Sequence, residues 1–90
     1  MAKITMDFRS KYSAGDVVVF EKGDRLMVGI VVGINFDMKN DNPIWYNIAV
    51  NKKCTYSFGN GGDVAEEDIL GKIGDDTLRK DAVRVITGGL

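Results

Sequence analysis

Carboxylates are the side chains of this sequence with the most obvious capacity for chemistry. Glu66, Glu67 and Asp68 are consecutive, and Asp75 and Asp76 follow them closely. Paired carboxylates can transfer protons when they are buried and face one another. This run belongs to a short polar turn, so we expect solvated charges or the start of a helix rather than an acid–base pair.

The other residue types that support catalysis or metal binding are scarce. The chain has no histidine and a single cysteine, Cys54, which we expect on an inner face as an inert thiol. The acidic loop over residues 37–41 lacks a calcium-loop pattern, and the Gly-rich loop over residues 59–62 lacks the Lys and Ser/Thr of a phosphate-binding loop. We therefore expect no cofactor, no metal and no enzymatic activity.

Trp45 is the residue that most suggests a binding surface. If Tyr46 points into the core, alternation along a strand places Trp45 on the outer face, where a large aromatic can anchor a partner. The termini of small barrels also shelter such aromatics, and that alternative stays open. Basic loop residues can add charge nearby, although interspersed acids favour a mixed, solvated surface. The candidate binding residues are Trp45, Phe36, Lys39, Lys53 and Arg25.

Length and charge limit the choice further. Ninety residues with a formal charge of -1 fit one small domain and argue against a general nucleic-acid coat, which needs a basic field. No apolar run has the length of a membrane span, and the first residues do not form a signal peptide. The sequence thus predicts a cytoplasmic protein that binds no membrane.

The best-defined segment begins with the strand over residues 17–20, whose four consecutive apolar residues predict cover on both sides. A turn containing Gly23 leads into a longer strand. There Gly29 and Gly33 permit a sharp bend, which is typical of small barrels.

The longer strand also carries the clearest alternation. Every even position from 26 to 36 is apolar, which predicts that these six side chains line one wall of the core: Leu26, Val28, Ile30, Val32, Ile34 and Phe36. Met27 and Asn35 are then expected to be more exposed. On this register, a charge placed at Val32 would unfold the domain.

The rest of the chain predicts two further strands, a loop and a variable tail. Residues 44–50 form a strand with its even positions inward, and Cys54, Tyr56 and Phe58 face inward on the next. Residues 59–63 are expected to form a flexible loop, and residues 64–70 a short helical turn that leads into a last strand. A helix from the Asp75 cap to about position 83, with Leu78, Ala82 and Ile86 as its apolar stripe, competes with a strand in the tail.

This pattern resembles the Src-homology-3-like small barrels, the group that includes Tudor and KOW modules. The matching segments are Gly15-Asp16-Val17-Val18-Val19, the Gly23 turn, Gly29-Ile30-Val31-Val32-Gly33-Ile34, the hairpin over residues 44–58 and the segment 64–70. The chain also resembles small proteins of phages and mobile elements. The resemblance implies a mainly β, five- to six-stranded, strongly bent barrel over about residues 15–73, with an N-terminal arm at 1–14 and a tail at 74–90, in a single domain 1–90.

A barrel of this group hosts many unrelated binding roles. The toxin barrels that open on a similar Gly-Asp-Val strand carry an Arg-Pro pair that this sequence lacks. The sequence therefore predicts a non-enzymatic interaction module that binds a protein partner, as a monomer or a homodimer. The alternative is a nucleic-acid-associated module of the KOW type.

Overall fold

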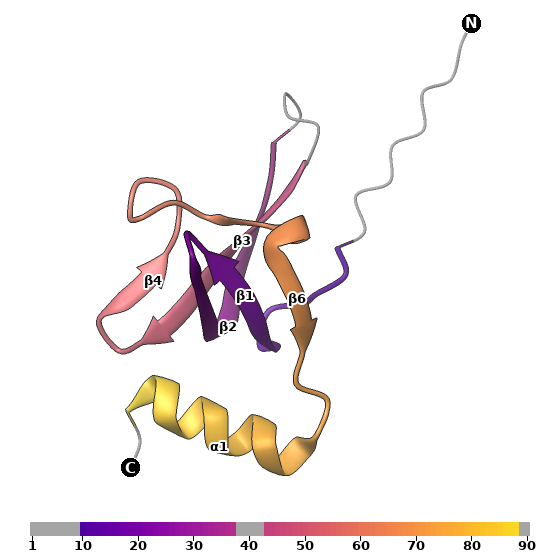
Figure 1. Ribbon diagram of the computed structural model, residues 1–90, viewed down its shortest axis with the longest axis vertical. Coiled ribbons are helices and arrows are strands. Elements are labelled where there is room, and N and C mark those ends of the chain that lie inside the picture. Colours follow the sequence, from indigo (N-terminus) through magenta and orange to yellow (C-terminus); the bar gives the residue numbers. More distant parts are fainter. Residues whose placement is uncertain (1–9, 38–42, 89–90) are drawn as a thin grey trace, which may run out of the picture.

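The computed structural model describes residues 10–37 and 43–88. It is mainly β, with one six-stranded antiparallel sheet and a short C-terminal helix (Figure 1). The elements are β1 (Val17–Lys22), β2 (Arg25–Phe36), β3 (Ile44–Asn51), β4 (Cys54–Tyr56), β5 (Val64–Ala65), a 3-10 helix (Glu66–Asp68), β6 (Ile69–Lys72) and α1 (Asp76–Thr87). The predicted helical turn and last strand over residues 64–70 are thus confirmed. Most of the predicted N-terminal arm lies outside the described residues.

The strands follow the order β4-β3-β2-β1-β6 along the sheet. The short β5 pairs with Trp45 and Tyr46 of β3, on the edge of β3 that β4 also uses and opposite β2. Strands β4 and β6 lie at the two ends, and among the described residues no ladder joins them. The mainly β class and the C-terminal helix are confirmed, whereas closure into a barrel is not.

The main core lies on one face of this sheet. Its largest fully buried side chains include Phe20 on β1 and Tyr46 and Ile48 on β3. Ile44, at the start of β3, belongs to the same cluster, and Val50 packs against it. The inward face predicted for β3 from its alternation is therefore confirmed.

The prediction for β2 is wrong at most of its even positions. Four of the six predicted core residues are exposed: Leu26 by 65%, Val28 by 41%, Val32 by 52% and Phe36 by 50%. Val31 is buried instead, and Met27 packs against the core. The cause is a bulge: Val31 pairs with Ile48, Gly33 pairs with the preceding residue of β3, and Val32 between them has no partner in the ladder. An extra residue exchanges the faces of a strand, so odd positions face the core before the bulge.

The tail is a helix and is longer than predicted. The carboxylate of Asp75 accepts a hydrogen bond of 2.9 Å from the backbone N–H of Leu78, which confirms the predicted N-cap. Helix α1 continues to Thr87 and ends at Gly88, whose φ of 71° is the left-handed cap. Of the predicted apolar stripe, Ile86 is buried, whereas Leu78 is 60% exposed.

Helix α1 covers part of the sheet face opposite the main core, and it contacts β1, β2 and β3 (Figure 1). Val17 and Ile86 are buried although neither belongs to the main cluster. Val17 shares the outer face of the sheet with Val28, which lies beside α1. The cover predicted on both sides of residues 17–20 is therefore confirmed, and α1 supplies part of it.

Candidate functional site

The binding residues named from the sequence do not form one site. Lys39 lies outside the described residues. Trp45 is the second residue of β3, whereas Lys53 lies in the turn that follows its end. The six residue steps from Trp45 to the end of β3 at Asn51 span roughly 20 Å. These two residues are therefore at opposite ends of the sheet.

Phe36 and Trp45 are neighbours in the β2–β3 ladder but point to opposite faces. Phe36 pairs with Ile44, which belongs to the main core, and Trp45 pairs with Asn35. Since directly paired residues share a face, Trp45 lies on the outer face, as its parity predicts. It is half-buried there.

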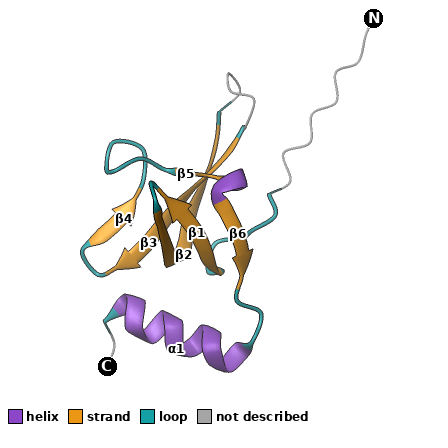
Figure 2. Ribbon diagram, in the orientation of Figure 1, coloured by secondary structure: helices purple, strands orange, loops and turns teal. Residues whose placement is uncertain are grey.

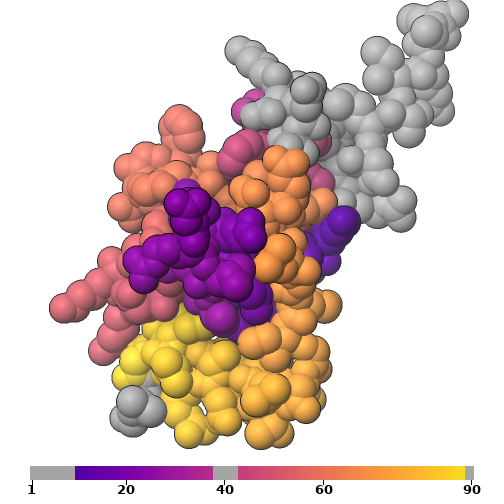
Figure 3. Space-filling model, in the orientation of Figure 1, coloured from indigo at the N-terminus to yellow at the C-terminus, as the bar shows by residue number. Residues whose placement is uncertain are grey.

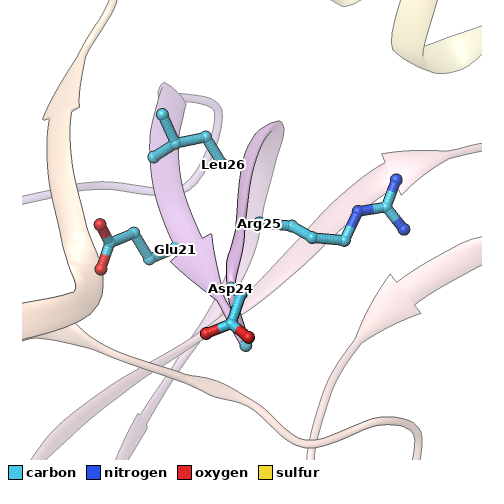
Figure 4. A pocket seen from close by; sticks show the side chains of 5 residues that line it. Glu21, Asp24, Arg25 and Leu26 are labelled. Carbon is cyan, nitrogen blue, oxygen red and sulfur yellow. The ribbon is translucent and has the colours of Figure 1, made fainter.

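Arg25 lies at the β1–β2 turn, beside a hollow of about 280 Å³ that is lined by Glu21, Gly23, Asp24, Arg25 and Leu26. Figure 4 shows the three charged side chains around it pointing away from one another. Two carboxylates thus share this surface with one guanidinium group. Such an arrangement does not concentrate the positive charge that phosphate binding requires.

The acidic run contributes to structure through its first residue. Glu67 and Asp68 are exposed, as predicted, but Glu66 is half-buried and accepts a hydrogen bond of 2.6 Å from the hydroxyl of Tyr46. Burial, together with this hydrogen bond to Glu66, raises the pKa of Tyr46 to about 12. At neutral pH Tyr46 is therefore a hydrogen-bond donor.

The same pair holds the segment that precedes the sheet. The backbone N–H of Lys11 donates to Glu66 over 3.2 Å, and that of Tyr12 donates to the hydroxyl of Tyr46 over 3.4 Å. The rings of Tyr12 and Tyr46 meet edge to face, with centroids 5.7 Å apart. This group of contacts fastens the chain before β1 to β3 and to the 3-10 helix.

A residue that the sequence analysis assigned to the core stands out on the surface instead. Phe58 is 89% exposed, in the loop that leaves β4 and protrudes away from α1 (Figure 2). The prediction that it faces inward with Cys54 and Tyr56 is wrong, because β4 ends at Tyr56. Alternation beyond the end of a strand has no structural meaning.

The loop that carries Phe58 is held by its own hydrogen bonds. Ser57 and Asn60 exchange backbone hydrogen bonds of 3.2 and 2.9 Å, and Gly62 donates to the carbonyl of Ser57 over 3.0 Å. The side-chain amide of Asn60 donates to the carbonyl of Thr55 over 2.9 Å. Gly59, Gly61 and Gly62 all have φ between 78° and 88°, a conformation that glycine adopts without strain.

Contacts with β1 and with the core also support this loop. The ammonium group of Lys22 donates to the carbonyl of Gly62 over 3.2 Å and lies 5.1 Å from the centre of the Tyr56 ring. The Tyr56 ring in turn meets Phe20 of the core edge to face, with centroids 6.3 Å apart. The loop predicted for residues 59–63 is therefore confirmed as a loop, and Phe58, which precedes it, presents an aromatic ring to solvent.

Within residues 10–37 and 43–88, no group of three or more His, Cys, Asp or Glu side chains is placed to hold a metal ion. Over the same residues, no helix combines the length and apolar character needed to cross a membrane. Comparison of the chain with protein-family models, curated proteins and solved structures finds no match.

Proposed function

We propose that this chain is a non-enzymatic interaction module that binds a protein partner through Phe58. The observation that carries the proposal is the 89% exposure of this aromatic ring on a turn fixed by its own hydrogen bonds. Aromatic anchors of this kind dominate the energetics of protein interfaces. Trp45, which is half-buried on the outer face, is a second surface aromatic rather than the main anchor.

The energetics favour binding by this ring. Full burial of an exposed phenylalanine side chain is worth roughly 1.5–3 kcal/mol before the costs of association. Those costs include the ordering of loops on binding. The hydrogen bonds within the loop that carries Phe58 restrict its backbone, which lowers the ordering cost that remains for binding.

Isolated exposed apolar residues are common on soluble proteins and need no functional explanation. Phe58 differs from Leu26 or Leu70, which lie on strands whose other residues build the core. The loop around Phe58 contributes no residue to the core cluster. Three glycines with positive φ and several backbone hydrogen bonds nevertheless maintain the shape of this loop. A turn of this kind fits the role of displaying the ring.

We also propose a Src-homology-3-like identity, on the strength of the sequence pattern over residues 15–70. The alternative function is the KOW type, in which the first hairpin contacts nucleic acid. The mixed charges around Arg25 favour nucleic-acid binding less than protein binding, because the carboxylates of Glu21 and Asp24 line the same hollow.

The test uses the chain as immobilised bait in a lysate of the cells that produce it, with and without nuclease treatment. Three baits are compared: the wild type, Phe58→Ser, and Leu70→Ser as a control at a residue that is 59% exposed. We expect a protein that the wild type and Leu70→Ser retain equally and that Phe58→Ser retains at least about tenfold less. Equal retention by all three baits would refute a role for Phe58, and retention that nuclease treatment abolishes would favour the KOW alternative.

A further inference from the structure

One asparagine of this chain has a neighbour that favours a reaction of its side chain. Asn60 is exposed in the loop over residues 57–62 and is followed by Gly61. The backbone nitrogen that follows an asparagine can attack the side-chain amide of that asparagine, and a glycine there lets the backbone approach closely because it has no Cβ atom. Asn60 is the only asparagine of the sequence that precedes a glycine; the others precede Phe36, Asp41, Pro43, Ile48 and Lys52.

The attacking nitrogen is accessible. The loop lies on the surface of the molecule, at the upper left of Figure 3 and away from α1. The N–H groups of Asn60 and Gly62 both donate to the carbonyl of Ser57, over 2.9 and 3.0 Å. The N–H of Gly61, which lies between them in the chain, donates to no acceptor among the residues that the structure describes. Its proton can therefore be removed without breaking a hydrogen bond of the loop.

The fold itself requires this pair of residues. Gly61 has a φ of 78°, and a Cβ atom there would lie 2.8 Å from Cδ1 of Tyr56. The side chain of Asn60 is used as well, since its amide donates to the carbonyl of Thr55 over 2.9 Å. The two residues that shape the loop are thus the two that can react with each other.

We propose that Asn60 is a modification site, at which the side-chain amide is lost spontaneously and the product releases the loop. The deprotonated nitrogen of Gly61 attacks Cγ of Asn60 and forms an imide ring, while the side-chain nitrogen takes up a proton and leaves as ammonia. Water then opens the ring at one of its two carbonyl carbons. Opening at Cγ leaves an aspartate, and opening at the backbone carbonyl carbon leaves an isoaspartate, so one water is consumed for each ammonia released.

Either product weakens the loop. A carboxylate has no proton to donate at neutral pH, so the hydrogen bond to the carbonyl of Thr55 is lost and oxygen atoms face each other there. An isoaspartate also adds a carbon to the main chain before Gly61, which displaces the N–H of Gly62 from the carbonyl of Ser57. The loop would then display Phe58 less well and weaken binding of a partner, and this consequence alone rests on the proposed function.

The hydrogen bond to Thr55 also affects how fast the reaction runs. It restrains the amide that must react, so we expect the folded chain to lose this amide more slowly than the unfolded chain. Exposed loops open locally at little cost in free energy. The restraint therefore slows the reaction in the folded chain and does not prevent it.

Peptide mapping by mass spectrometry after incubation at mildly alkaline pH tests the modification. The full chain is incubated folded and, separately, unfolded in guanidinium chloride. In the folded chain we expect conversion of Asn60 to be at least about tenfold faster than that of Asn51, which is also exposed but precedes Lys52. Asn60→Gln, whose longer side chain closes the ring poorly, should stay unmodified at this position. An Asn60 that stays intact in the folded chain while the unfolded chain converts completely, or that converts no faster than Asn51, would overturn the inference.

Hydrogen exchange tests the release of the loop. Asn60→Asp reproduces one product and Asn60→Gln is the uncharged control; the position is exposed, and circular dichroism confirms that each variant folds. We expect the N–H of Gly62 to exchange at least about threefold faster in Asn60→Asp than in the wild type, with a smaller change in Asn60→Gln. Equal exchange in Asn60→Asp and the wild type would show that the loop is not released. Both experiments use the chain alone, so their failure is distinct from failure of the lysate experiment on Phe58.

Discussion

The hydroxyl of Tyr46 donates a hydrogen bond of 2.6 Å to the carboxylate of Glu66, and the two residues together hold the backbone N–H groups of Lys11 and Tyr12. Tyr46 has no solvent-exposed surface, so its ring belongs to the core. Its hydroxyl accepts a hydrogen bond from the segment before β1. One side chain therefore joins the core to the chain that leads into the sheet.

Replacing Tyr46 by Phe tests this link. The change keeps the ring but leaves Glu66 and the N–H of Tyr12 without their partner, and the lost hydrogen bond involves a charged acceptor. We expect the free energy of unfolding to fall by about 1–3 kcal/mol. Urea denaturation measures this change, and Tyr12→Phe, which leaves the hydroxyl of Tyr46 in place, is the matched control. An unchanged stability in Tyr46→Phe would show that the hydrogen bond contributes nothing net.

The same residue predicts a dependence on alkaline pH. The pKa of Tyr46 is raised from 10.0 to about 12 in the folded protein, so the folded state holds this proton more tightly than the unfolded state. The resulting stability is complete below pH 10 and is lost as the pH rises toward 12. The loss is of the order of 2 kcal/mol. Wild type and Tyr46→Phe should therefore converge in stability over this interval, and parallel curves would contradict the assignment.

The bulge in β2 gives a sharp comparison between two adjacent valines. Val31 is 1% exposed and Val32 is 52% exposed. An aspartate at Val31 would place an unpaired charge in the core, so we expect Val31→Asp to lose more than about 4 kcal/mol and to be unfolded. Val32→Asp should cost about 1 kcal/mol or less. Thermal denaturation of both variants checks the register, and a folded Val31→Asp would contradict it.

Gly29 on β2 lies close against β3, with no room for a side chain. A Cβ atom at this position would overlap the side chain of Ile48 and lie 2.8 Å from the carbonyl oxygen of Ala49. We expect Gly29→Ala to destabilise the protein by about 2–3 kcal/mol. Gly71→Ala is the control, because nothing lies within 4 Å of its Cβ, and it should change stability by less than about 1 kcal/mol. Equal effects in chemical denaturation would show that the strands separate without cost.

Helix α1 allows a comparison between two residues of its predicted apolar stripe. Ile86 is buried, whereas Leu78 is 60% exposed. Truncating Ile86 to Ala should therefore cost about 2–4 kcal/mol, and truncating Leu78 to Ala should change stability by less than about 0.5 kcal/mol. If both truncations prove neutral in urea denaturation, α1 does not stabilise the sheet.

The successes and failures of the sequence analysis have physical causes. The alternation in β3 predicts its core face correctly because residues 44–48 contain no bulge. The Asp75 cap is a local signal, and it marks the start of α1 correctly. The end of α1 is set by the Gly88 cap and by burial of Ile86 against the sheet, and this burial overrides the β-branched run at residues 85–87.

The failures arise where contacts distant in sequence decide the outcome. In β2 both faces carry apolar residues, because α1 covers part of the second face, so alternation alone could not show where the bulge lies. Phe58 continues the alternation of β4, although the strand ends two residues earlier. The signal for its exposure was available in the next residues: Gly59, Asn60, Gly61 and Gly62 predict a turn that begins at this point.

Photo-crosslinking from position 58 tests the central claim most directly. A photoreactive phenylalanine, p-benzoylphenylalanine, replaces Phe58 in intact cells that produce the chain, and the same residue at Leu70, which is 59% exposed, is the control. After irradiation we expect discrete protein adducts from position 58, which mass spectrometry identifies, and at least about tenfold less of them from position 70. The absence of protein adducts at position 58, or equal labelling from both positions, would contradict the claim that Phe58 is the residue through which this chain binds a protein.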